Sequence, residues 1–328
     1  MVWIIFLLCS AVIVFAAMKL AEYGDAISIH TNLGGAFIGL LLMAGATSLP
    51  ELLTSINSIE QSVPDLAAGN TFGSNMFNML LIGIMGFISW RKRILRQVAR
   101  KHALSGSIAA ILIALSIFLI QANLDVKIGW VGLDSLLLII SYILGVYLIQ
   151  SNSAPPQPID PKDIDDSIPS LRKAVIGFSL ATLALILTMP YLVSSSTEIA
   201  EITGLGAGFV GTVLVSFVTS LPEMVTTIAA IRLGVYDMAM GNLFGSNMFN
   251  IFTLGFADFF MTSGRFLDVI SIDFTLVAMI GLIMTLLALI GNIAKLNRRF
   301  LLVEIDAALL VITYLLGMFI IYQKGIGL

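Results

Sequence analysis

The sequence predicts an all-α polytopic membrane protein with ten transmembrane helices in two inverted five-helix repeats. Its 328 residues are 58% hydrophobic and 11% charged, whereas soluble domains are about 25% charged. Apolar runs of about 20 residues, the length that crosses a bilayer as a helix, recur along the whole chain. A polar motif also occurs twice, once in each half of the chain.

Ten spans follow from the apolar runs. The first has no positively charged region before it, so we interpret it as a span rather than a cleaved signal peptide. The predicted spans cover residues 2–22, 32–58, 64–89, 103–121, 129–150, 172–197, 205–231, 236–262, 270–293 and 300–323. The single cysteine, Cys9, excludes an intramolecular disulfide and a cysteine-based metal site.

A polar segment, residues 151–171, separates the two halves of the chain. It holds five of the nine prolines, a composition typical of a linker. It divides the chain into a first five-helix repeat, residues 1–150, and a second, inverted repeat, residues 172–328. We expect the linker to be solvated. A regulatory Ca²⁺ site is the alternative interpretation of three of its aspartates, Asp163, Asp165 and Asp166.

The distribution of Lys and Arg predicts which side of the membrane each connection faces. Six basic residues crowd the segment 91–101, so we expect that loop to be cytoplasmic by the positive-inside rule. Alternation from this loop places the linker inside and both termini outside. With this assignment 14 of the 17 Lys and Arg residues fall inside, and only Lys127, Arg265 and Lys324 fall outside. Because each half has an odd number of spans, the second half must enter the membrane from the opposite side.

The repeated motif has two parts. Thr-Ser-Leu-Pro-Glu at 47–51 and 219–223 is followed by Gly-Asn-x-x-Gly-Ser-Asn-Met-Phe-Asn at 69–78 and 241–250. One constant shift, here called the repeat offset, takes position 47 to position 219 and position 78 to position 250 without a gap. Between 47 and 78, 20 of the 32 positions are identical to their partners, which indicates an internal duplication. Inverted repeats that each carry a polar motif are typical of transporters whose site lies at the repeat interface near mid-membrane.

Each motif offers hard oxygen ligands inside a predicted span. Pro50 and Pro222 have no amide hydrogen, so each should kink its helix and free nearby carbonyl groups. Thr47 and Glu51 share a helix face because they are at positions i and i+4. Carboxylate, hydroxyl, amide and carbonyl oxygens suit Ca²⁺ or Na⁺ rather than soft metals. The Gly-x-x-x-Gly spacing in each motif predicts that the third and eighth spans pack closely against the second and seventh.

Several polar residues also have a structural interpretation. Glu51 and Glu223 could each bond a neighbouring helix, but ionised groups inside spans are costly and are functional by default. The motif hydroxyls could bond carbonyls of their own helix instead of a ligand. Asp65 and Asp237 are expected to be helix N-caps. Four asparagines are expected to hold helices together: Asn70, Asn75, Asn242 and Asn247. Five acidic residues without a duplicate are expected to be interfacial or structural: Asp134, Asp258, Asp273, Glu304 and Asp306.

The two motifs resemble the α-repeats of the Ca²⁺/cation antiporter superfamily, and those of the sodium/calcium exchangers in particular. The match covers residues 45–78 and 217–250. The resemblance implies exchange of Ca²⁺ for Na⁺ by alternating access, through ten helices in two inverted halves. It also implies that ten residues ligate the transported ions: Glu51, Glu223, Thr47, Thr219, Ser48, Ser220, Ser74, Ser246, Asn78 and Asn250.

The sequence departs from the pattern of that family at two pairs of positions. The family usually has Gly before the Thr-Ser pair, where this chain has Ala46 and Val218. A less flexible backbone there would alter sodium sites that use the neighbouring carbonyls. Potassium-dependent members have Asp at one or both of the positions matched by Asn78 and Asn250, so the two asparagines argue against potassium dependence.

The alternative functions are a Ca²⁺/H⁺ or other divalent cation exchanger and, with less support, a cation channel. No Ser-Lys or Ser-His pair, paired catalytic Asp or His-Glu-x-x-His motif occurs, so we predict that the chain is not an enzyme. We expect no cofactor other than transported Ca²⁺ and Na⁺ as bound ions. We expect the lipid bilayer as surroundings, no nucleic acid and no protein partner, hence a monomer. The expected location is a prokaryotic plasma membrane, with both termini outside.

Overall fold

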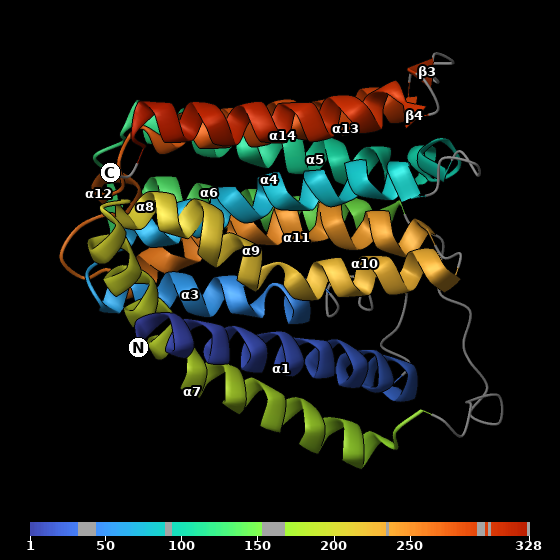
Figure 1. Cartoon of the computed structure of the whole chain (residues 1–328), viewed down its shortest axis with the longest axis horizontal. Helices are drawn as coiled ribbons and strands as arrows, with labels where there is room; N and C mark the ends of the chain where they lie inside the picture. The colour runs from blue at the N-terminus through green and yellow to red at the C-terminus, as the bar shows by residue number, and fades with distance from the viewer. Residues whose placement is uncertain are drawn as a thin grey trace.

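The computed structural model describes residues 1–31, 44–88, 94–152, 168–233, 236–293, 299–300 and 303–326. Nearly all of these residues are helical, and the long helices run side by side in one bundle (Figure 1). The two short hairpins are the only strands among them. The linker aspartates and the basic loop 91–93 lie outside the described residues, so the predictions for them remain predictions.

Among its described residues, the first half of the chain forms four long helices, the shorter helix α3 and one hairpin. Helix α1 ends ahead of residues 32–43, and Ala44–Thr47 then form the helical turn that leads into α3. The elements are α1 (Val2–Thr31), α3 (Leu49–Glu60), α4 (Pro64–Ile88), α5 (Ile94–Ala122), β1 (Lys127–Ile128), β2 (Val131–Gly132) and α6 (Leu133–Ser151). The fifth span was predicted to begin at residue 129, which is wrong because residues 127–132 form the β1–β2 hairpin.

The second half repeats this order with more breaks. Its first helix, α7, runs to Thr203, past the predicted end at residue 197, and stops at Gly204 in the left-handed conformation. The elements are α7 (Leu171–Thr203), α8 (Ala207–Val210), the π-helix η2 (Gly211–Val215), α9 (Ser216–Thr219), α10 (Leu221–Leu233), α11 (Tyr236–Ala257), η3 (Asp258–Phe260), α12 (Phe266–Val269), α13 (Phe274–Ile293), β3 (Arg299–Phe300), β4 (Val303–Glu304) and α14 (Ile305–Lys324).

The helices have the length and composition of membrane spans. Six described helices are long and apolar enough to cross a bilayer, and a bent pair, Ala207–Thr219 with Leu221–Arg232, makes a seventh. The chain is therefore an integral, multi-pass membrane protein. The count of ten remains a prediction, because residues 32–43 are outside the described part and the apolar stretch of α13, Phe274–Ile290, is shorter than a full span.

The repeat offset extends well beyond the two motifs. The β1–β2 hairpin pairs Lys127 with Gly132, and the β3–β4 hairpin pairs Arg299 with Glu304, at the positions that the same offset connects. Each hairpin leads into a helix whose second residue is aspartate, Asp134 in α6 and Asp306 in α14. Our prediction that these two aspartates have no duplicate was wrong: the repeat offset relates them, and each accepts a bond from the amide of the next residue.

Helices α4 and α11 form the centre of the bundle. They contact each other, and between them they contact α3, α5, α6, α10, α13 and α14. Helices α1 and α7 lie side by side at one edge of the bundle, and α14 lies at the opposite edge with α13 and α5 (Figure 1). Large apolar side chains are exposed on the outer helices, as expected for a lipid-facing surface. Both termini lie at the same end of the bundle, opposite β3 and β4 (Figure 1).

Glycines of the first motif allow α4 to approach the broken seventh span. A side-chain carbon at Gly69 would collide with the carbonyl oxygen of Gly208, and one at Gly73 would collide with that of Thr212. A side-chain carbon at Gly211 would likewise collide with the carbonyl oxygen of Leu66 in α4. The prediction that the third span packs closely against the seventh is therefore confirmed, and the contact runs along the π-helix η2. A π-helical turn in an otherwise α-helical segment often marks a functional site.

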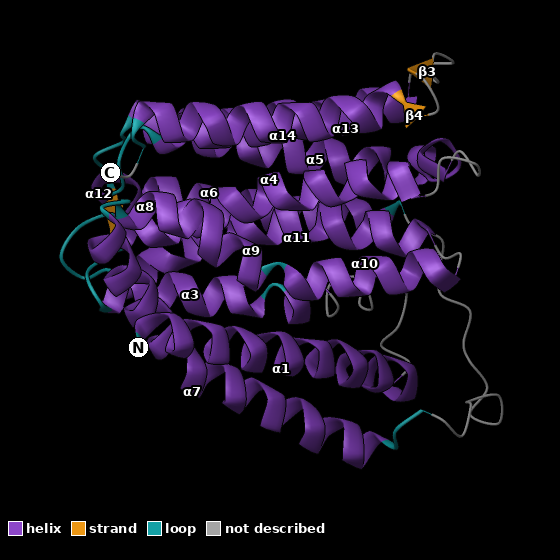
Figure 2. Cartoon of the chain, in the orientation of Figure 1, coloured by secondary structure: helices purple, strands orange, loops and turns teal. Residues whose placement is uncertain are grey.

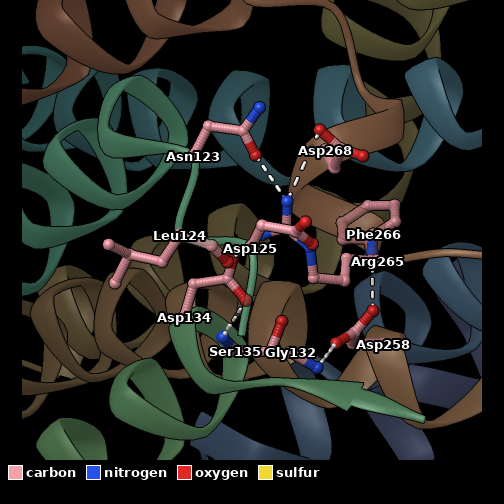
Figure 3. Close-up of polar contacts among 10 residues, drawn as sticks. All are labelled: Asn123, Leu124, Asp125, Gly132, Asp134, Ser135, Asp258, Arg265, Phe266 and Asp268. Atoms are coloured by element: carbon pink, nitrogen blue, oxygen red, sulfur yellow. Dashed lines mark hydrogen bonds and ion pairs between the residues drawn. The ribbon is translucent and has the colours of Figure 1, made fainter. Parts of the chain in front are cut away.

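A buried polar cluster joins the two halves (Figure 3), and the neighbouring helix α12 lies at the end of the bundle that carries the termini (Figure 1). Arg265 is 3% exposed, and its Nη1 lies 2.8 Å from Oδ2 of Asp134, which is 0% exposed. The same guanidinium donates to the carbonyl of Leu124 and, at 2.6 Å, to Oδ1 of Asn123. Arg265 lies between η3 and α12 in the second half, while its three partners lie around the α5–α6 connection of the first half.

A second carboxylate, Asp258, completes this cluster. Its Oδ2 accepts from the amide of Gly132 at 2.7 Å, and its Oδ1 accepts from the amide of Phe266 at 2.5 Å (Figure 3). The structural roles predicted for Asp134 and Asp258 are confirmed. The prediction for Asp65 is wrong: it lies in the first turn of α4 rather than at the N-cap, and its Oδ1 accepts from the amide of Ser271 at 2.9 Å. The side chain of Asp237 lies outside the described residues.

Candidate functional site

The two Thr-Ser-Leu-Pro-Glu segments break their helices at equivalent points in the middle of the bundle. Ser48 has φ −93° and ψ 10°, and Ser220 has φ −91° and ψ 5°, so both leave the α-helical region. The break between α9 and α10 is visible in Figure 2, and the two pieces of this span are bent by 41°. The predicted kinks are confirmed, and their cause is the proline two positions later, which has no amide hydrogen for the carbonyl of Ala46 or Val218.

Each break presents a glutamate to a serine of the other half. Ser48 donates to Oε1 of Glu223 at 3.0 Å, and Ser220 donates to Oε1 of Glu51 at 3.2 Å. The repeat offset relates Ser48 to Ser220 and Glu51 to Glu223, so each half makes the same contact with the other. Ser246 on α11 also donates to Oε1 of Glu223, at 3.2 Å. Glu51 is 1% exposed and Glu223 is 0% exposed, so both carboxylates are enclosed by protein.

The threonines of the motif face asparagines across the same interface. Thr219 donates to Oδ1 of Asn70 at 3.0 Å, and Thr47 reaches Oδ1 of Asn242 at 3.5 Å. Ser74 and Thr219 bring their hydroxyl oxygens within 3.5 Å of each other. The alternative in which motif hydroxyls bond their own helix applies to the threonines, since Thr47 also bonds the carbonyl of Ala44. Ser48, Ser220 and Ser246 instead point at carboxylates.

Four asparagines from α4 and α11 form two bridges between the halves. Asn78 donates through Nδ2 to Oδ1 of Asn247 at 2.9 Å, and Asn250 donates through Nδ2 to Oδ1 of Asn75 at 3.0 Å. The repeat offset also relates these two bridges to each other, because it takes Asn78 to Asn250 and Asn75 to Asn247. The expectation that Asn70, Asn75, Asn242 and Asn247 hold helices together is confirmed, because each bonds a residue of the opposite half.

Four buried carboxylate and amide oxygens at this interface accept no hydrogen bond from the described residues. They are Oε2 of Glu51, Oε2 of Glu223, Oδ1 of Asn78 and Oδ1 of Asn250. All four residues belong to the predicted ligand set, and all are at most 1% exposed. Buried acceptors without donors are costly unless another group satisfies them. A cation does so, and carboxylate and amide oxygens are ligands that Ca²⁺ and Na⁺ accept.

All ten residues predicted as ligands lie around this interface. The breaks before α3 and α10 hold Thr47 and Ser48, and Thr219 and Ser220. The first turns of the same two helices hold Glu51 and Glu223. Ser74 and Asn78 come from α4, and Ser246 and Asn250 from α11. Their role as ion ligands remains a prediction. Thr212 and Ser216, which line the contact with Gly69 and Gly73, were not singled out, because the first half has Leu40 and Ala44 at the equivalent positions.

Several proteins with a similar sequence or structure are described as cation exchangers. The sodium/calcium exchanger MaX1 of Methanosarcina acetivorans is 28% identical over 286 residues, which cover 78% of this chain and 81% of the relative. The solved H⁺/Ca²⁺ exchanger CAX has the same fold, with a TM-score of 0.68 at 14% identity over 99% of this chain and 89% of that one. The solved sodium-calcium exchanger NCX_Mj has a TM-score of 0.59 at 22% identity over 96% of each chain.

The family model described as sodium/calcium exchanger protein matches residues 1–150 and 173–323, which are most of the chain. These two segments leave out only residues 151–172 and 324–328. The motifs, the breaks at Ser48 and Ser220 and the enclosed glutamates all lie inside the matched segments. The chain therefore belongs to the sodium/calcium exchanger protein family.

Proposed function

We propose that this protein is a secondary active antiporter that exchanges Ca²⁺ for Na⁺ across the membrane by alternating access. Its architecture would be ten transmembrane helices in two inverted five-helix repeats, with the ions bound at the interface between the repeats. The proposed ligands are Glu51, Glu223, Thr47, Thr219, Ser48, Ser220, Ser74, Ser246, Asn78 and Asn250.

The single observation that carries this proposal is the group of four buried oxygens without hydrogen-bond donors among the described residues, on Glu51, Glu223, Asn78 and Asn250. Two of them belong to carboxylates and two to neutral amides, so the ligands carry a charge of about −2 when both glutamates are ionised. One Ca²⁺ neutralises this charge, and so do two Na⁺. Neutralisation matters because an uncompensated charge enclosed at the centre of a membrane protein is expensive.

The crossed serine–glutamate bonds support alternating access. Each glutamate is held by a serine from the other half, Ser220 for Glu51 and Ser48 for Glu223, so neither half contains a complete site. A movement of one half against the other changes both bonds together. In two equivalent but inverted halves, such a movement closes one side of the site as it opens the other.

Sodium is proposed as the counter-ion because the family model and the relative MaX1 are described as sodium/calcium exchangers. Coupling to H⁺ is the alternative, and each carboxylate at the site has the chemistry to carry a proton. Calcium uptake into proteoliposomes under Na⁺, K⁺ or H⁺ gradients, imposed one at a time, distinguishes these cases. We expect uptake with an outward Na⁺ gradient only. Uptake that an H⁺ gradient drives equally well without Na⁺ would overturn the choice of Na⁺, and large unitary currents would indicate a channel.

A further inference from the structure

We propose that Asn75 and Asn247 are positioning residues that fix which end of the Asn250 and Asn78 amides faces the transported ion. This inference rests on the proposed function, because it gives the two amide oxygens a cation to bind. Asn75 and Asn247 are not among the proposed ligands. Their side chains are 1% and 0% exposed, and each stands one helical turn before the proposed asparagine ligand of its own helix, α4 or α11.

An asparagine amide presents two ends of nearly equal size and opposite polarity. The oxygen accepts hydrogen bonds and attracts cations, whereas the NH₂ group donates and repels them. Packing alone does not distinguish the two ends, so a hydrogen-bonding partner has to do so. At Asn78 that partner is Oδ1 of Asn247, which accepts from Nδ2 at 2.9 Å. This bond turns Oδ1 of Asn78 away from Asn247. Oδ1 of Asn78 accepts no hydrogen bond from the described residues.

The orientation of Asn247 is itself fixed. Its Nδ2 donates to the backbone carbonyl of Asn75 at 3.3 Å, and a backbone carbonyl only accepts. The direction of the Asn78 amide is therefore set by the backbone of α4 acting through Asn247. If Asn247 were turned over, its Nδ2 would face Nδ2 of Asn78, and two donors would meet. An inverted Asn78 would place its NH₂ group where the cation ligand is needed.

The second bridge repeats the arrangement with one bond fewer. Nδ2 of Asn250 donates to Oδ1 of Asn75 at 3.0 Å, and Oδ1 of Asn250 accepts nothing from the described residues. Nδ2 of Asn75 has no hydrogen-bond acceptor among those residues. The orientation of Asn250 is therefore less firmly held than that of Asn78. Asn247 should consequently matter more than Asn75 for binding of the ion.

A carboxylate in place of the positioned amide provides a specific test. Both ends of an aspartate side chain are oxygens, so Asp at position 78 presents an oxygen to the ion in either orientation. An orienting partner is then unnecessary. If Asn247 acts by orienting Asn78, Asn247→Leu should weaken Ca²⁺ binding in the native background and have little effect in the Asn78→Asp background. A packing role for Asn247 would instead give the same loss in both backgrounds, which a double-mutant cycle measures.

The experiment compares four full-length proteins in proteoliposomes: the native protein, Asn247→Leu, Asn78→Asp and the double variant. The readouts are the KM for Ca²⁺, the maximal exchange rate, and the Ca²⁺-dependent rise in the unfolding temperature of the purified protein, which reports binding without transport. We expect Asn247→Leu to raise the KM about tenfold or more in the native background, as for a misoriented buried hydrogen-bonding group. In the Asn78→Asp background we expect less than about a threefold change.

A matched control is Asn57→Leu. Asn57 is also a buried asparagine, on α3, but its Nδ2 donates to the carbonyl of Leu53 in its own helix. We expect its KM for Ca²⁺ to stay within about twofold of the native value. If Asn247→Leu does not fold, the equivalent cycle of Asn75→Leu with Asn250→Asp tests the same idea, with a smaller effect expected.

The outcomes separate the two proposals. A native protein that neither transports Ca²⁺ nor is stabilised by it refutes the proposed function. A native protein that does both, together with an Asn247→Leu variant whose KM is unchanged or rises equally in both backgrounds, refutes only the positioning role.

Discussion

Replacing Arg265 by methionine should destabilise the folded protein by about 3–5 kcal/mol. The magnitude follows from the surroundings of its partner. Asp134 is 0% exposed, and the guanidinium 2.8 Å away is the only cation that any described contact gives it. Without Arg265 the carboxylate keeps only the amide of Ser135, at 2.9 Å, and is left inside the protein without a compensating charge. An uncompensated buried charge is what makes breaking such a pair costly.

Replacing the other member of the ion pair, Asp134, should destabilise the protein less. In Asp134→Asn the guanidinium keeps the carbonyl of Leu124 and Oδ1 of Asn123, and the exposed carboxylates of Asp125 and Asp268 lie at 3.7 and 3.6 Å. We expect a loss of about 1–3 kcal/mol. The double variant Arg265→Met/Asp134→Asn removes both charges. It should therefore be more stable than Arg265→Met alone by about 2 kcal/mol, since removing the pair together leaves no isolated charge.

Unfolding of the purified protein in mixed micelles, at rising mole fractions of sodium dodecyl sulfate, provides the assay. Tryptophan fluorescence suits it, because Trp130 donates to the carbonyl of Phe259 directly beside the cluster. Arg232→Met is the control, since Arg232 is exposed at the end of α10 and its loss should change stability by less than about 0.5 kcal/mol. An Arg265→Met protein within about 1 kcal/mol of native stability, or single losses that simply add in the double variant, would refute the reasoning.

Three further predictions concern transport and topology. Glu51→Gln and Glu223→Gln should each abolish Ca²⁺ exchange while leaving a folded protein, because each removes one of the two charges at the site; near-normal flux in either variant would contradict the ligand assignment. Cysteines introduced into a Cys9→Ser protein should react with impermeant maleimide in intact cells when placed at the exposed positions Thr262 or Ser263, and should stay unlabelled at 91–101; labelling of the basic loop would reverse the predicted orientation. If three Na⁺ exchange for one Ca²⁺, one net charge crosses per cycle, worth about 2.3 kcal/mol per 100 mV. A potential clamped positive inside Na⁺-loaded proteoliposomes should then accelerate Ca²⁺ uptake, and uptake that ignores the potential would indicate two Na⁺ per Ca²⁺.

Much of the candidate site could be predicted from the sequence, because its residues recur at a fixed offset. The duplication singled out Glu51 and Glu223 among apolar residues, and Pro50 and Pro222 located the helix breaks by their chemistry. The partners were harder to predict. That Ser48 faces Glu223, and Ser220 faces Glu51, depends on how the two halves pack, which no local pattern contains.

The cluster around Arg265 was missed for the same reason. Asp134 and Arg265 lie far apart in the sequence, and their contact joins the start of α6 in one half to the loop before α12 in the other. A signal was nevertheless present. The repeat offset relates Asp134 to Asp306, and it also relates Arg93 to Arg265, although Arg93 lies outside the described residues. Both pairs are thus present in the sequence, outside the motif residues 47–78.

The exchange of partners between halves has a consequence for biogenesis. When residues 1–150 have entered the membrane, Glu51 is already inside a helix, but Ser220 has not yet been synthesised. At that stage the partner of Asn78, which is Asn247, and the partner of Asp134, which is Arg265, have not been synthesised either. Polar groups without partners are costly in lipid, so water or another protein group has to satisfy them. The first half should therefore remain a loose assembly, open to water or to a chaperone, until translation has passed residue 265 and the two halves can close on each other.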